Sequence, residues 1–124
     1  MGKIADIIER IPALFADEPS LVRRAGRAEI TILLEAGDQT RRLILDRGTL
    51  RVAAASGPMD SWDIALRGAE EAFMDHWQKM PAPDAADIFG MRRRGRLVIE
   101  GNFLPLMRHL QVVKDIQALP RRVS

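Results

Sequence analysis

The segment of residues 95–110, GRLVIEGNFLPLMRHL, constrains the fold more than any other part of this chain. Leu97, Val98 and Ile99 form a short apolar run that is typical of a buried strand. Gly101 follows closely, and Asn102 is a residue that often caps the first turn of a helix. The residues after Asn102 are large, flexible and apolar. The segment therefore predicts a strand, a tight glycine corner and then a helix.

In the first half of the chain, the spacing of apolar residues separates helices from strands. A helical stripe predicts an amphipathic helix over residues 3–16, which Pro12 divides or kinks near Ile11. Ser20 predicts the cap of a short helix over residues 21–25. Alternating apolar and polar residues, separated by glycine-containing turns, then predict strands over residues 30–34, 41–45 and 50–55.

The second half of the chain predicts one further strand before the glycine corner, and more helices. Trp62, Ile64 and Leu66 share one face of a fourth strand, and a helix with regularly spaced large side chains follows over residues 69–78. After a proline-rich hinge, Asp84 caps a short helix, residues 97–99 form the fifth strand, and the last helix covers residues 102–119. We therefore expect residues 1–124 to form a single α+β domain. In it, about five mainly antiparallel strands make a sheet covered on one face by helices.

This order of elements resembles the sterol-carrier-protein type-two family over most of residues 10–120. The resemblance is carried by the Trp62 strand, the aromatic helix ending at Trp77, and the GRLVIEGN corner. It implies a non-catalytic module that binds a fatty acid, a sterol-like molecule or another lipid in an internal apolar cavity, and that transfers lipid. The alternative is an accessory or assembly domain of the same fold, with a vestigial cavity, that pairs with a partner enzyme or with a second copy of itself.

Aromatic and methionine side chains are concentrated in the second half of the chain and are candidates for lining such a cavity. Flexible thioethers suit a site that accepts irregular aliphatic ligands, although each of these residues also fits an ordinary core. Met74 is a further candidate of this kind. The predicted cavity set consists of Phe73, Trp77, Met80, Phe89, Met91, Phe103, Met107 and Leu110.

The predicted last helix carries two apolar stripes. The first consists of Phe103, Leu106, Met107 and Leu110. The second, roughly on the opposite side, consists of Val112, Ile116 and Leu119. We expect the first stripe to face the interior and contact ligand, and the second to meet another part of the protein or a second subunit. Alternatively, the helix stops near Val113 and the remainder packs as a separate segment.

The densest cluster of charge is a run of arginines, Arg92, Arg93 and Arg94, with Arg96 close behind. One interpretation is a surface for anionic lipid headgroups, and the other is the solvated rim of a loop. Nucleic acid is disfavoured as a partner because no aromatic residue interleaves the run and the net charge is only +2.

No pattern of catalytic or metal-binding residues stands out. The two histidines, His76 and His109, lack metal-ligand spacing, there is no cysteine, and no serine lies in a nucleophile elbow. We therefore expect neither an enzyme nor a metal or cofactor site. Apolar runs fall far short of the roughly 20 residues that a membrane helix needs, and we expect a cytoplasmic protein.

Overall fold

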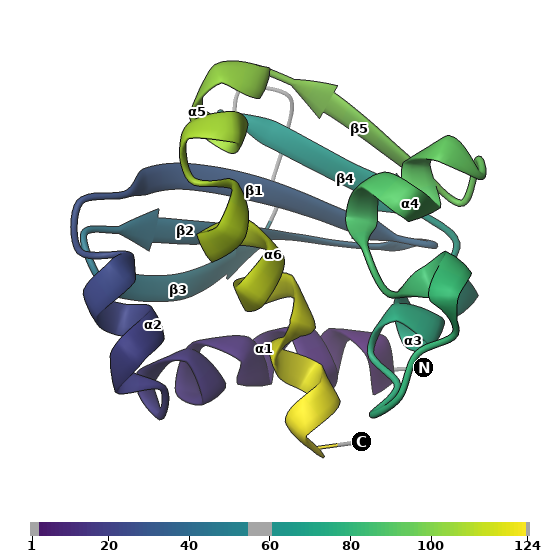
Figure 1. Cartoon of the computed structure of the whole chain (residues 1–124), viewed down its shortest axis with the longest axis horizontal. Helices are drawn as coiled ribbons and strands as arrows, with labels where there is room; N and C mark the ends of the chain where they lie inside the picture. Colours follow the sequence, from purple (N-terminus) through teal and green to yellow (C-terminus); the bar gives the residue numbers. More distant parts are fainter. Residues whose placement is uncertain (1–2, 55–60, 124) are drawn as a thin grey trace.

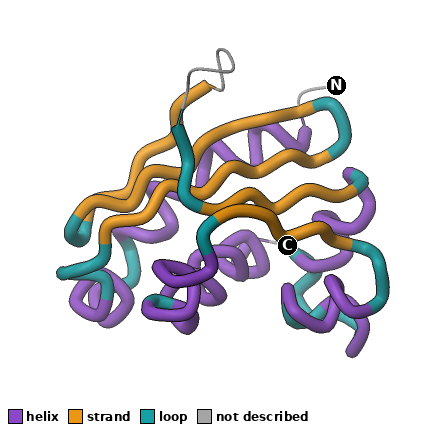
Figure 2. The backbone as a smooth tube through the Cα atoms, turned by 90° about the horizontal axis from the view of Figure 1, so that it is seen from above, coloured by secondary structure: helices purple, strands orange, loops and turns teal. Residues whose placement is uncertain are grey.

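A computed structural model describes residues 3–54 and 61–123 of the chain as one sheet with helices packed on one of its faces. Figure 2 shows the two layers, with the strands above and the helices below. The five strands lie in the order β3-β2-β1-β4-β5. The predicted fold class is confirmed.

The sheet is mixed, because one of its four strand pairs is parallel. Its strands are β1 (Glu29–Ala36), β2 (Gln39–Asp46), β3 (Thr49–Ala54), β4 (Ile64–Gly68) and β5 (Leu97–Gly101). β1 and β4 run parallel, while the pairs β1–β2, β2–β3 and β4–β5 are antiparallel. The observed strand ends differ from the predicted ones by no more than two residues. Residue 55, which we expected to end the third strand, lies outside the described residues.

Helices form most of the connections between the strands and cover one face of the sheet (Figure 1). They are α1 (Lys3–Ala16), α2 (Pro19–Arg24), α3 (Glu70–His76), α4 (Ile88–Arg93), α5 (Phe103–Arg108) and α6 (Leu110–Ala118), with short 3-10 turns η1 (Pro83–Ala85) and η2 (Leu119–Val123). α1 packs along β3 and β2, at one edge of the sheet, and against η2. α4 and α5 flank β5, which forms the opposite edge.

Two local predictions about helix caps are wrong, and one about α1 is wrong in part. Pro12 does not divide α1, because Ile11 and Phe15 on either side of it are buried in the same core and this packing outweighs one lost hydrogen bond. A kink near Ile11 stays a prediction. α2 begins at Pro19 and Ser20 is not its cap. The cap of α4 is Asp87, whose carboxylate accepts a hydrogen bond of 2.7 Å from the Phe89 amide, and not Asp84.

The space between the sheet and the helices is filled by side chains. Ile32, Leu34, Leu43 and Leu66 point from the strands toward Ile8 and the other buried residues of the helices, and all of them are fully buried. The interior of the described part of the domain is thus a packed core.

The predicted last helix is two helices. His109, with φ −117° and ψ 29°, interrupts it between α5 and α6. α6 buries Val112 and Ile116 against the domain, with Leu119 after them, whereas Met107 on α5 is 54% exposed. The expectation that the first stripe faces the interior is therefore wrong for Met107. The alternative of two separately packed segments describes the structure, with the break at His109 and not near Val113.

Candidate functional site

A pocket of about 570 Å³ opens where α1, the end of α3 and η2 meet. These three segments are far apart in the sequence but lie together at the lower right of Figure 1, near both ends of the chain. Contacts between α1 and η2 hold the two terminal segments side by side. This pocket is the candidate binding site.

The pocket has an apolar surface built from three elements. α1 contributes Ile7, α3 contributes Met74, and η2 contributes Pro120 and Val123. Trp77 completes it at the C-terminal end of α3, where the Nε1 group donates a hydrogen bond of 2.8 Å to the carbonyl of Gln117. Its ring centroid is 5.6 Å from that of Phe73. The buried Trp77 therefore joins α3 to the C-terminal segment beneath the pocket.

Polar groups lie along α1 and at the end of α3. Lys3, Asp6 and Arg10 border the pocket from α1, and Gln78 borders it from the α3 side. Within residues 3–54 and 61–123, neither Lys3 nor Arg10 forms an ion pair. An apolar floor with two cations and one carboxylate at its border suits a molecule with an apolar body and a polar end.

The structure does not gather the predicted cavity residues into one site. Phe73, Trp77 and Met91 are buried in the core, and of the eight only Trp77 lines the pocket. Three are half-buried on the side of α4, α5 and α6, and two are exposed. The half-buried residues are Phe89, Phe103 and Leu110, and the exposed residues are Met80 at 90% and Met107 at 54%.

Sequence reasoning missed the contribution of α1. Ile7 lies beside the buried stripe of Ile4, Ile8 and Ile11, so it reads as one more core residue of an amphipathic helix. The sequence did hold one indication that Ile7 lines a site. Ile7 lies at the margin of the buried stripe, and the charged residues Lys3 and Arg10 precede and follow it on the same side of the helix. That signal gives no information about α3 and η2, which complete the site.

The arginine run divides into two parts. Arg92, Arg93 and Arg94 are exposed at the end of α4. Arg96 instead donates a hydrogen bond of 2.6 Å to Asp75, and this carboxylate raises the pKa of Arg96. Arg96 is therefore part of an ion pair that ties the start of β5 to α3, and it is half-buried, unlike the other three.

His76 is buried and is held in place by backbone and side-chain partners. Its Nδ1 atom lies 2.7 Å from the carbonyl oxygen of Ala85, and its own carbonyl accepts a hydrogen bond of 2.7 Å from Arg121. Burial lowers the pKa of His76, and the positive charge of Arg121 lowers it further. The described residues contain no group of three or more side chains placed to bind a metal ion. Among them, no helix is both long enough and apolar enough to cross a bilayer.

The chain matches no protein family model and no curated protein. Its fold is nevertheless that of solved sterol carrier proteins. A crystal structure of sterol carrier protein 2 is 13% identical with a TM-score of 0.68, and the match covers 96% of this chain and 96% of that one.

Two further solved structures share the fold. The UbiJ-SCP2 ubiquinone synthesis protein is 14% identical with a TM-score of 0.63, over 98% of this chain and 95% of that chain. The inverting sec-alkylsulfatase Pisa1 from Pseudomonas sp. is 18% identical with a TM-score of 0.54, over 73% of this chain but 14% of the sulfatase chain. The fold therefore occurs both as almost an entire chain and as a small part of an enzyme.

Proposed function

We propose that this chain binds a lipid or another apolar small molecule without catalysing a reaction, and that the ligand lies in the pocket between α1, α3 and η2. The observation that carries the proposal is the pocket itself. Its volume of about 570 Å³ lies within the range of roughly 300–1,000 Å³ typical of small-molecule sites. The sterol-carrier fold supports the same function class.

The chemistry of the pocket favours a single-chain amphiphile such as a fatty acid. Ile7, Met74 and Trp77 offer an apolar surface to an aliphatic chain, and the thioether of Met74 adapts to its shape. Lys3 and Arg10 border the same pocket and favour a carboxylate at the polar end. The ligand then lies at a corner of the domain and not between the sheet and the helices, where the core is filled.

A titration with a fluorescent fatty acid tests this proposal. Met74→Gln makes the pocket wall polar, and Leu14→Gln is its matched control, because both residues are half-buried and pack against the core but Leu14 lies outside the pocket. We expect Met74→Gln to weaken binding about tenfold, equivalent to about 1.4 kcal/mol of lost apolar contact. Leu14→Gln should bind as the wild type does. Equal loss in both variants, or no saturable binding by the folded wild type, would contradict the proposal.

A second function, that of an accessory domain for a partner enzyme, is favoured by two observations. The interior is a packed core, and the same fold forms a small part of an alkylsulfatase chain and nearly all of a protein described as acting in ubiquinone synthesis. An accessory domain needs no bound lipid. Mass spectrometry of lipids extracted from the freshly purified protein separates the two functions, because a stoichiometric lipid supports the carrier and its absence supports the accessory domain.

A further inference from the structure

Two large apolar side chains project from α5 into solvent. Leu104 is 65% exposed and Met107 is 54% exposed, while Leu106 between them is fully buried and fixes the helix to the domain. The helix breaks at His109, so α6 buries Val112 and Ile116 in a direction of its own, while Leu104 and Met107 of α5 stay exposed. Exposed large apolar residues that lie close together on one helix are typical of a binding surface.

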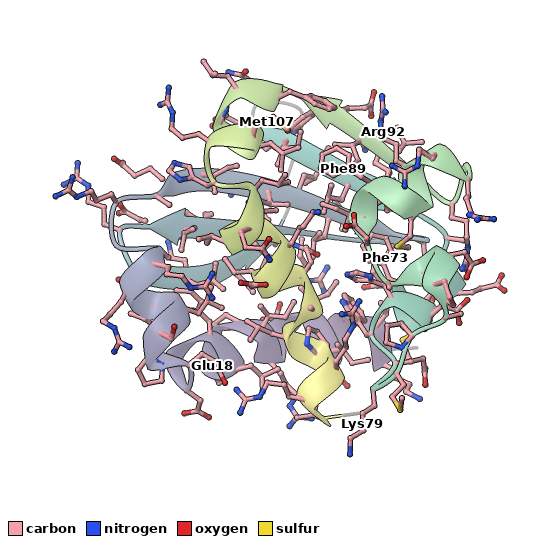
Figure 3. The ribbon with its side chains drawn as sticks, viewed as in Figure 1. Glu18, Phe73, Lys79, Phe89, Arg92 and Met107 are labelled. Atoms are coloured by element: carbon pink, nitrogen blue, oxygen red, sulfur yellow. The ribbon has the colours of Figure 1, made fainter. Side chains whose placement is uncertain are left out.

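Arginines lie on α5 and at the end of α4, the two helices that flank β5. Arg108 follows Met107 on α5, and Arg92, Arg93 and Arg94 end the neighbouring helix α4. The guanidinium carbon of Arg92 lies 5.8 Å from the centroid of the Phe103 ring, so this side chain reaches from the end of α4 to the first residue of α5. Figure 3 shows Arg92 and Met107 along the same upper edge of the molecule.

Among the described residues, the four arginines have no acidic partner. In the part of the chain that the structure describes, none of them forms an ion pair, whereas Arg67, Arg96 and Arg122 each contact a carboxylate. All four are exposed. We call this surface the basic apolar edge, and it consists of Leu104, Met107, Arg92, Arg93, Arg94 and Arg108.

We propose that the basic apolar edge docks on the surface of a bilayer that contains anionic lipids. Leu104 and Met107 enter the boundary between headgroups and acyl chains, and the arginines contact the negatively charged headgroups around them. Unpaired cations and projecting apolar side chains on one surface match both properties of such a membrane. The proposal concerns a surface separate from the lipid pocket and does not depend on it.

A second copy of this chain fits the edge poorly. A two-fold symmetric contact brings the same surface of both copies together, so that the arginines of one copy would face those of the other. An acidic protein is another possible occupant of the edge, because its negative charge complements the arginines. The polyglutamate experiment below separates such a partner from a membrane.

Vesicle flotation tests the proposal on the full chain. We expect the protein to float with vesicles of phosphatidylcholine and phosphatidylglycerol, and to remain unbound with phosphatidylcholine alone. Binding should weaken as salt concentration rises. Failure of the wild type to float with the anionic vesicles at low salt would overturn the proposal.

Charge reversal tests the role of the arginines. Arg92→Glu combined with Arg93→Glu should weaken vesicle binding at least roughly twenty-fold, because each basic residue near such a surface contributes about 1 kcal/mol. The matched control is Arg27→Glu with Arg51→Glu, two exposed arginines elsewhere that give the same net charge. Equal loss in the two double variants would show that net charge alone drives binding and would overturn the proposed edge.

A polar substitution tests the apolar contact. Met107→Gln should weaken vesicle binding several-fold, while Met80→Gln should leave it unchanged, since Met80 is 90% exposed but lies in the loop after α3. Unchanged binding by Met107→Gln would overturn insertion of α5. Binding of the wild type to soluble polyglutamate but not to anionic vesicles would assign the edge to an acidic protein and overturn the membrane proposal.

Discussion

At the scale of the residue, Gly101 leaves less room for a side chain than any other described glycine, because the carbonyl oxygen of Asp63 occupies the place of a Cβ atom. Its φ is +116°, and a Cβ atom there would lie 2.9 Å from the Trp62 ring and 3.1 Å from the Cα of Ile64. Gly95 has φ +74° but no atom within 4 Å of the same position. We expect Gly95→Ala to lower the free energy of unfolding by about 1 kcal/mol through backbone strain. Gly101→Ala should cost about 3 kcal/mol or more, because overpacking is added. Urea denaturation measures both, and similar values would show that the corner relaxes freely.

A second prediction at the residue scale concerns His76 and the dependence of the free energy of unfolding on pH. Burial, opposed in part by the hydrogen bond to Ala85 and helped by Arg121, holds its pKa below the ordinary value of 6.5. The unfolded chain therefore takes up a proton as the pH falls through about 6.5, and the folded protein does so only at lower pH. The free energy of unfolding should be constant above this pH and decrease below it. His76→Gln should remove that decrease, and His109→Gln should retain it because His76 is intact. Urea denaturation from about pH 5 to pH 7.5 checks the prediction.

At the scale of the element, the break at His109 makes opposite predictions for two similar substitutions. Ile116 is fully buried in α6, and Met107 is 54% exposed in α5. Ile116→Asp should lower the free energy of unfolding by about 3 kcal/mol or more, because it buries an unpaired charge. Met107→Asp should change it by less than about 0.5 kcal/mol, as is usual at the surface. Thermal or urea denaturation of both variants tests the register, and a large loss for Met107→Asp would show that α5 packs inward.

The elements themselves could be predicted from the sequence wherever one local pattern determines them. The alternation in β1 and the corner from β5 to Asn102 were predicted because side-chain period, glycine and cap agree there, and the Asn102 carboxamide does accept a hydrogen bond of 3.1 Å from Leu104. Asp84 and Asp87 cannot be distinguished in this way. Both are aspartates before a short helix, and the ion pair of 2.8 Å between Asp87 and Lys114 is a tertiary contact.

The same reason limits prediction of the candidate site. Ile7, Met74 and Val123 come from three distant segments, and nothing in the periodicity of α1 indicates that η2 lies beside it. The predicted set contained Trp77 because large aromatic residues often line apolar sites, yet Met80 in the same set is 90% exposed. Residue type identified candidates, and only the packing of the two ends of the chain determines which of them meet.

At the scale of the whole molecule, the pocket and the basic apolar edge lie toward opposite edges of the sheet, both on the side that the helices cover. α1, which borders the pocket, packs along β3 and β2, while α4 and α5 flank β5 at the other edge (Figure 1). No residue belongs to both surfaces. Their ligands should therefore bind independently, since substitutions at separated sites without shared partners usually act additively.

This independence can be measured with variants that each affect one surface. Met74→Gln should weaken fatty-acid binding and leave flotation with anionic vesicles unchanged. Arg92→Glu combined with Arg93→Glu should have the reverse effect, and a triple variant should show both losses, each of its separate size. The measurement is one fatty-acid titration and one flotation assay on all three proteins, with circular dichroism confirming that each is folded. If the pocket substitution also abolishes flotation, the bound lipid alters the edge, and the two surfaces are coupled through α6 and the core beneath it.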